Sequence, residues 1–159
     1  MKAYFKRISE GATLPSYGTD EAACCDLYLS EELQLDAGQT AFAHTGLVAI
    51  PPKGYHWQIY LRSSTPRNHP GLILANHVGI VDSDYSGPED EIKLLLTNVS
   101  MSHIYLSKGE RVAQMRLVKN IRPEIEEIKD SEEQDEGNRR RGGAKLRSRS
   151  RHGFGSTGK

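Results

Sequence analysis

Two carboxylates in one short segment are the residues of this chain best suited to chemistry. The segment NHVGIVDSDYSG runs from Asn76 to Gly87 and contains Asp82 and Asp84, two residues apart. In an extended chain such residues lie on the same face, and a carboxylate there can take a proton from a water molecule. Folded as a hairpin, the segment would also offer backbone amides and the Asn76 side chain to the edge of a base. The alternative is a surface hairpin whose aspartates cap a turn.

Three other segments carry polar side chains at or beside apolar runs. Residues 62–64, RSS, follow one such run and supply a cation and two hydroxyls, which suit phosphate oxygens. In GERVAQM, Arg111 and Gln114 lie in and beside an apolar run, so each is either satisfied within the structure or directed at a site. Asp26 lies within AACCDLYL, where a carboxylate could help to hold a hydrated metal. Taken alone, each segment is also compatible with ordinary scaffold.

The chain ends with RSRHGFGSTGK, residues 149–159, which combines arginines, one aromatic residue, glycines and hydroxyls. Phe154 could lie on a base, while the neighbouring glycines let backbone N–H groups approach phosphate oxygens. The hydroxyls of Ser156 and Thr157, with an arginine, would complete such a grip. A disordered basic tail has a similar composition, so both interpretations stay open for this segment alone.

Short apolar runs separated by turn residues must position these groups. No segment keeps a helical period long enough for a core helix. Many short strands joined by turns are typical of an antiparallel sandwich or barrel, so the chain is expected to be all-β. The runs expected to be strands are residues 3–8, 24–29, 39–50, 55–63, 71–76, 91–98, 103–107 and 110–118.

The composition divides the chain into three parts. Residues 1–129 are expected to form one β domain, residues 130–148 a charged flexible linker, and residues 149–159 a closing segment. The net charge of zero conceals an acidic stretch at 124–136 and a basic stretch at 139–151. The basic stretch is compatible with a solvated linker, with attraction to the acidic stretch, with nucleic-acid contact or with nuclear import.

Cysteine, histidine and hydropathy patterns favour an intracellular protein, cytoplasmic or nuclear. The only cysteines, Cys24 and Cys25, are adjacent and imply no disulfide framework. The six histidines lack the spacing of a zinc site. No signal peptide is expected, because charged residues interrupt the beginning of the chain. No apolar run approaches the length that spans a membrane, so no membrane contact is expected.

Taken in order, AACCDL, RSS, NHVGIVDSDYSG, GERVAQM and RSRHGFGSTG resemble the five motifs of the trimeric dUTPases. The resemblance extends from Ala22 to Gly158, and GIVDSDY and GFGSTG are its most specific parts. It implies a distorted jelly-roll β-barrel whose flexible C-terminal arm is exchanged between the subunits of a homotrimer. It also implies Mg²⁺-dependent hydrolysis of dUTP to dUMP and pyrophosphate, which would limit uracil incorporation into DNA and supply dUMP for dTTP synthesis.

The resemblance assigns roles to the residues of the central segment. Asp82 matches the aspartate that activates the water attacking the α-phosphorus. Asn76 lies where the family reads the uracil edge, with backbone groups of Gly79 and Val81 completing the pattern. Tyr85 matches the tyrosine under the sugar, which leaves no room for a ribose 2′-hydroxyl.

The same resemblance implies how the triphosphate is held. Arg62, Ser63 and Ser64 match phosphate contacts, and Gln114 matches a contact near the α-phosphate. Asp26 matches an acid that meets Mg²⁺ through water, with most other magnesium ligands coming from the substrate.

The closing arm would complete the site of a neighbouring subunit. Phe154 would stack on uracil, and the backbone of Gly155 would approach the phosphates. Ser156 and Thr157 would hold the terminal phosphate, while Arg149 would neutralise its charge. Closure would exclude water from the site.

Two alternatives belong to other functional classes. One is a binding or regulatory protein with this fold, which uses its basic segment at 139–151 to contact nucleic acid or a partner protein. The other is an enzyme resembling dCTP deaminase. A deaminase needs a glutamate three residues before the position of Asn98, where this chain has Leu95, and it lacks the aromatic closing arm.

Overall fold

Residues 1–127 are described by a computed structural model, in which residues 1–121 form one compact unit. Short strands dominate this unit, and the helix α1 among them is a single turn. In chain order the elements are β1 (Tyr4–Arg7), β2 (Ser16–Tyr17), β3 (Cys25–Leu27), β4 (Leu33–Leu35), β5 (Thr40–His44), β6 (Leu47–Ile50), β7 (Tyr55–Leu61), α1 (Thr65–Asn68), β8 (Leu72–Leu74), β9 (Gly79–Val81), β10 (Lys93–Asn98), β11 (Ile104–Leu106) and β12 (Ala113–Lys119).

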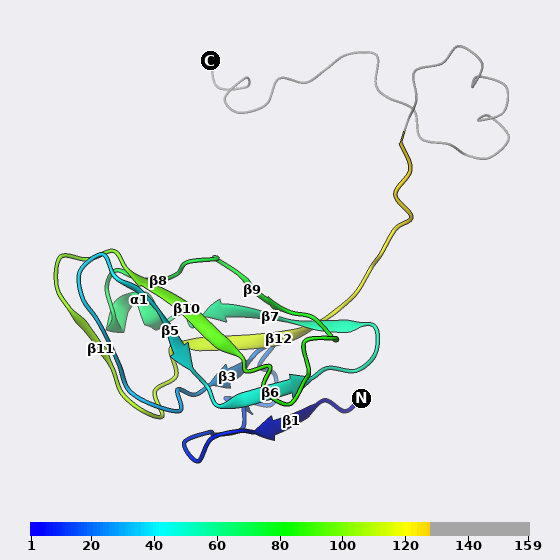
Figure 1. Ribbon diagram of the computed structural model, residues 1–159, viewed down its shortest axis with the longest axis horizontal. Helices are drawn as coiled ribbons and strands as arrows, with labels where there is room; N and C mark the ends of the chain where they lie inside the picture. The colour runs from blue at the N-terminus through cyan, green and yellow to red at the C-terminus, as the bar shows by residue number, and fades with distance from the viewer. Residues whose placement is uncertain (128–159) are drawn as a thin grey trace, which may run out of the picture. The chain divides into compact units, whose positions relative to one another are not determined.

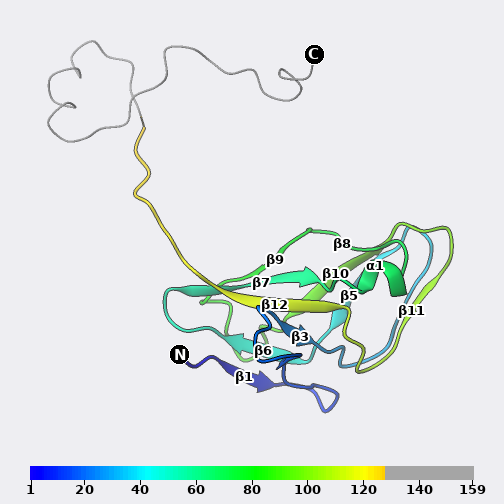
Figure 2. The ribbon, with the colours of Figure 1, turned by 180° about the vertical axis from the view of Figure 1, so that it is seen from behind.

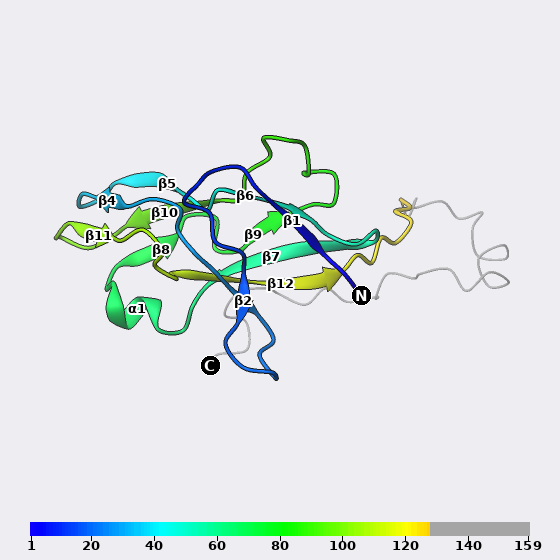
Figure 3. The ribbon, with the colours of Figure 1, turned by 90° about the horizontal axis from the view of Figure 1, so that it is seen from below.

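All strand pairs of the described residues are antiparallel, and they form four small sheets (Figure 1). The largest sheet has the order β2-β3-β12-β7-β9. A second has the order β5-β10-β8, and two pairs, β1-β6 and β11-β4, complete the set. Figure 2 shows from behind that β12 lies between β3 and β7. Figure 3 shows β4 and β11 beside the β5-β10-β8 sheet, with α1 near β8.

One hydrophobic core lies between these sheets. Strands of all four sheets contribute to it, because alternate residues of each strand face inward. In β7 and β10, for example, every second residue is buried near the middle of the strand. The core includes Leu35, Ala49, Trp57, Leu96 and Met115. The architecture is an all-β, jelly-roll-like fold, which confirms the fold class expected from the sequence.

The strand expected over residues 39–50 is two strands in the structure. β5 ends at His44 and β6 begins at Leu47, because Gly46 adopts a φ of 66°. A Cβ at Gly46 would lie 2.1 Å from the Ser9 hydroxyl oxygen, so only glycine fits this turn. The short elements β2, β4 and α1 were not expected, since two to four residues are too few to show a period.

The second unit begins at Arg122, and its described residues, 122–127, are exposed and form no helix or strand. The acidic and basic stretches, the linker at 130–148 and the closing segment at 149–159 lie mostly or wholly outside the described residues. Within residues 1–127, no helix has the length and apolar character that crossing a membrane requires.

Candidate active site

The central segment begins with a tight turn between β8 and β9, which belong to different sheets. The amide of His77 donates to the Leu74 carbonyl at 3.0 Å, and the amide of Val78 donates to the Asn76 carbonyl at 2.6 Å. His77 has a φ of 60°, an uncommon value for a residue other than glycine. Asn76 is exposed at this turn. The segment is therefore a tight turn and not the hairpin expected from the sequence, because β8 pairs with β10 and β9 pairs with β7. The turn presents the asparagine to solvent.

Strand β9 holds the rest of the segment against β7. Gly79 pairs with Ile59, and a Cβ at Gly79 would lie 3.1 Å from the Ile59 Cβ, so glycine permits this close approach. Val81 is buried in the core. The next residue, Asp82, is exposed, as strand alternation requires. The structure thus presents the Asp82 carboxylate to solvent at the end of a strand fixed by a buried neighbour.

Tyr85 lies beside Asp82 because a turn joins them. The Tyr85 amide donates to the Asp82 carbonyl at 3.2 Å. The Tyr85 side chain is 43% exposed, so a face of its ring is available to a ligand. The site residues of the central segment therefore form one set, which we call the hairpin group after the fold expected from the sequence. Its members are Asn76, Gly79, Val81, Asp82 and Tyr85.

A second group gathers around Asp26 on β3. The Asp26 carboxylate is nearly buried, and its two oxygens accept from the Arg62 Nε at 2.8 Å and from the Arg111 Nη1 at 3.1 Å. Arg62 Nη1 also donates to the Arg111 carbonyl at 3.1 Å. Asp26 therefore neutralises and orients two guanidinium groups, each of which keeps further N–H donors.

Ser63, Ser64 and Gln114 belong to the same region. Ser63 and Gln114 line one pocket, together with Cys24, Tyr60, Leu61 and Arg116. Gln114 pairs with Asp26 in the β12–β3 register, and its Nε2 donates to the Leu61 carbonyl at 3.1 Å. Ser64 is the N-cap residue of α1 but makes no side-chain cap hydrogen bond. We call this second set the Asp26 group; its members are Asp26, Arg62, Ser63, Ser64 and Gln114.

Asp82 and Arg62 lie toward opposite ends of β7. Since Val81 pairs with Trp57 and Gly79 with Ile59, Asp82 follows β9 at the level of His56. Arg62 follows the other end of β7 (Figure 1). The separation is about six residues of extended strand, or roughly 20 Å. One chain therefore does not bring Asp82 and Arg62 to the same phosphate.

The residues near Asp26 fit Mg²⁺ only as an outer partner. Within residues 1–127, no three His, Cys, Asp or Glu side chains are grouped so that they could hold a metal ion. Each Asp26 oxygen has one guanidinium partner and keeps a further lone-pair position for a water. Mg²⁺ retains several waters and binds readily to phosphates, so this donor set is compatible with it.

The thiol next to Asp26 is kept neutral. Burial raises the pKa of Cys25 to about 11, and the nearby Cys24 and Asp26 add to the rise. Cys25 Sγ lies 3.5 Å from the Met115 carbonyl oxygen. The arm residues Arg149, Phe154, Gly155, Ser156 and Thr157, in contrast, lie outside the described residues.

Sequence reasoning did not assign sites to Arg111, His44 and Glu91. Arg111 was noticed as a charge before an apolar run, but its pairing with Asp26 depends on strand register across 85 residues. Glu91 is buried and accepts hydrogen bonds, although its type predicts an exposed position. No local pattern distinguishes it from the exposed Glu89.

Comparisons with known proteins all lead to one family. The family model described as dUTPase matches residues 10–144. The deoxyuridine 5'-triphosphate nucleotidohydrolase of Nautilia profundicola is 35% identical over 159 residues, which is 100% of both chains. The dUTPase structure from Streptococcus mutans has a TM-score of 0.69 at 30% identity, over 76% of this chain and 98% of that one. The Staphylococcus bacteriophage 80alpha dUTPase with dUPNHPP has a TM-score of 0.78 over 99% of this chain and 98% of that one, and at 20% identity it shows similarity of fold.

Proposed function

This chain belongs to the dUTPase family and is a dUTP diphosphatase, and from that premise we propose that Asp82 activates the water that hydrolyses dUTP. The exposed carboxylate at the end of β9 supports this role. It is available to accept the proton that the water loses as it attacks the α-phosphorus. The bond between the α-phosphorus and the bridging oxygen then breaks, which yields dUMP and pyrophosphate.

The hairpin group would recognise the nucleoside. The exposed Asn76 side chain and the backbone at Gly79 and Val81 would meet the uracil edge, and the ring of Tyr85 would lie under the sugar. A set of donors and acceptors made for uracil leaves groups unpaired against cytosine, which is a strong basis for rejection. Close packing of Tyr85 against the sugar would likewise exclude a ribose 2′-hydroxyl.

The Asp26 group would bind the triphosphate. Arg62, Ser63 and Ser64 offer guanidinium and hydroxyl donors to phosphate oxygens, and the Gln114 amide would contact the α-phosphate. Asp26 would hold Arg62 in place and contact magnesium through water. Bound Mg²⁺ would neutralise phosphate charge, and most of its ligands would be substrate oxygens and water.

The separation of Asp82 and Arg62 along β7 supports a site shared between subunits. A closed symmetric trimer can place the hairpin group of one copy against the Asp26 group of another. The arm residues Arg149, Phe154, Gly155, Ser156 and Thr157 would then close over a neighbour's nucleotide. The single observation that carries this proposal is that Asp82 and Arg62 lie at opposite ends of the antiparallel pair formed by β7 and β9.

The experiment is to measure pyrophosphate release from dUTP, dCTP, dTTP and UTP, with Mg²⁺ and with a chelator. We expect release from dUTP, strong discrimination against the other three, and large loss without Mg²⁺. Deamination of dCTP would favour the deaminase alternative instead, although Leu95 is a half-buried strand residue that pairs with Phe42. Tight nucleotide binding without hydrolysis would favour a binding protein.

A further inference from the structure

We infer that Glu91 is a positioning residue for Tyr85 and thereby contributes to the preference for deoxyribose over ribose. The inference rests on the proposed place of Tyr85 under the sugar. The Tyr85 hydroxyl donates to the backbone carbonyl of Glu91 at 3.1 Å. Because the ring itself is 43% exposed, this contact is a main restraint on where the ring lies. The position of the Glu91 carbonyl therefore matters for the sugar.

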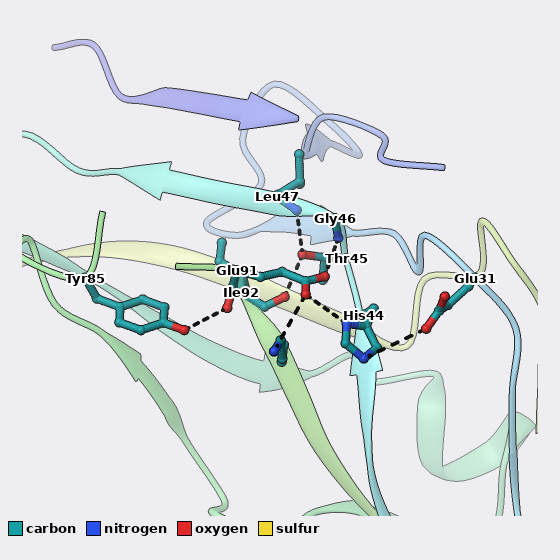
Figure 4. Close-up of polar contacts among 9 residues, drawn as sticks. Glu31, His44, Thr45, Gly46, Leu47, Tyr85, Glu91 and Ile92 are labelled. Atoms are coloured by element: carbon teal, nitrogen blue, oxygen red, sulfur yellow. Dashed lines mark hydrogen bonds and ion pairs between the residues drawn. The ribbon is translucent and has the colours of Figure 1, made fainter. Parts of the chain in front are cut away.

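The side chain of Glu91 anchors that carbonyl. Glu91 is only 8% exposed, and its Oε1 accepts from the Gly46 amide at 2.8 Å. His44 Nδ1 lies 2.8 Å from Oε2 and donates to it. Figure 4 shows Glu91 held between these residues, with the Tyr85 hydroxyl directed at its carbonyl. His44 ends β5 and Gly46 lies in the turn that leads to β6, so the Glu91 side chain is tied to the junction of these two strands.

The neighbouring backbone reinforces the anchor. The Ile92 amide donates to the Leu47 carbonyl at 2.8 Å, and the Thr45 hydroxyl donates to the Ile92 carbonyl at 2.7 Å. Thr45 and Ile92 are buried. The Glu91 carbonyl is therefore held from two sides. The backbone of Ile92 is bonded to Leu47 and Thr45, and the Glu91 carboxylate is bonded to Gly46, so moving the carbonyl would strain these contacts.

The hydrogen bond from the Tyr85 hydroxyl to the Glu91 carbonyl attaches the loop between these residues to the barrel. The loop's own hydrogen bonds close it locally: the Gly87 amide donates to Asp90 Oδ2 at 2.7 Å, and the Asp90 amide donates to the Gly87 carbonyl at 3.3 Å. These bonds keep the loop compact but do not attach Tyr85 to the barrel. The hydroxyl–carbonyl contact makes that attachment, and the Glu91 carboxylate makes it rigid.

The test is a double-mutant cycle on substrate preference. The ratio of kcat/KM for dUTP to that for UTP is measured for the wild-type enzyme, Glu91→Ala, Tyr85→Phe and the double variant. Each single change should lower the ratio about fivefold, the size expected from losing one net hydrogen bond. Since both changes remove the same restraint, the double variant should be no worse than either single one. Glu91→Gln, which keeps an acceptor for Gly46, should retain most of the ratio.

A matched control separates positioning from general damage. Glu89→Ala removes a glutamate two residues away, whose exposed side chain makes no hydrogen bond within residues 1–127, and it should leave the ratio unchanged. A purely structural role for Glu91 would reduce activity on both substrates alike and leave the ratio where it was. If Glu91→Ala does not fold, His44→Ala replaces it in the cycle, because it removes the imidazole that holds the Glu91 carboxylate and lies at a half-exposed position.

Tyr85→Ala tells failure of this inference from failure of the proposed function. If Tyr85→Ala leaves the ratio unchanged, the role of Tyr85 under the sugar is wrong. If Tyr85→Ala lowers the ratio but the Glu91 and Tyr85→Phe variants do not, the inference alone is overturned. Independent effects that multiply in the double variant would overturn it too.

Discussion

At the scale of single residues, exposure followed from the sequence but pairing did not. The extended chain considered for the central segment places Asp82 and Asp84 on one face, and in the structure both are exposed while Val81 is buried. The two guanidinium partners of Asp26 were unpredictable, because they come from segments far apart in the chain. The buried position of Glu91 was also missed, since carboxylates are ordinarily exposed.

Replacing Asp82 with asparagine should reduce kcat for dUTP by a factor of about 10² to 10⁴, the usual contribution of a positioned base. Because Asp82 is exposed, the midpoint of chemical unfolding should not move. Steady-state assays and urea titration check both statements.

Asp84→Asn is the matched comparison, since it changes an exposed carboxylate two residues away on the same segment. Its kcat should fall far less. Loss of activity in Asp84→Asn together with near-normal turnover in Asp82→Asn would show that Asp84, and not Asp82, is the base.

At the scale of elements, long apolar runs predicted strands well and turns predicted their limits less well. The runs at 55–63, 91–98 and 110–118 correspond to β7, β10 and β12. The break between β5 and β6 was missed because it depends on the close approach of Ser9 to Gly46, a tertiary contact. The short strands β2 and β4 form because neighbouring strands offer hydrogen bonds, not because of their own pattern.

Cys25 on strand β3 makes the free energy of unfolding depend on pH in the alkaline range. The pKa of the Cys25 thiol is raised from 9.0 to about 11, so the thiol stays protonated in the folded state at a pH where it has already ionised in the unfolded state. Its contribution is therefore complete below pH 9 and is lost as pH rises from about 9 to 11. The loss should reach about 2–3 kcal/mol. Urea midpoints at fixed protein concentration, between pH 8 and 10.5, measure it.

Cys25→Ala is the control for that measurement, because lysines and tyrosines also titrate in this range. The variant should start less stable at pH 8 and then lose stability less steeply than the wild-type protein. Parallel slopes for the two proteins would show that the Cys25 thiol is not responsible.

At the scale of the whole molecule, residues 1–127 of one chain do not bring Asp82 and Arg62 together. The order of motifs is the basis for proposing which residues take part, whereas the roughly 20 Å between Asp82 and Arg62 became apparent only from the register of β7 and β9. Strand register depends on pairing across the sheet, so it could not be derived from any one segment.

Mixing two inactive variants tests the shared site. One chain carries Asp82→Asn, and the other lacks residues 149–159. Each alone should form trimers with little turnover, and the Asp82→Asn trimer should have three times the 17.7 kDa mass of the full chain. Refolded together, they should regain activity, because an intact hairpin group can be closed by a neighbour's arm. Normal trimers without any recovery would mean that the arm serves its own subunit.

The position of the incoming oxygen tests the central claim most directly. Hydrolysis of dUTP is run in water enriched in ¹⁸O, and both products are analysed by mass spectrometry. If a water activated by Asp82 attacks the α-phosphorus, dUMP carries the label and pyrophosphate does not. Label in pyrophosphate would mean attack at the β-phosphorus and would contradict the mechanism.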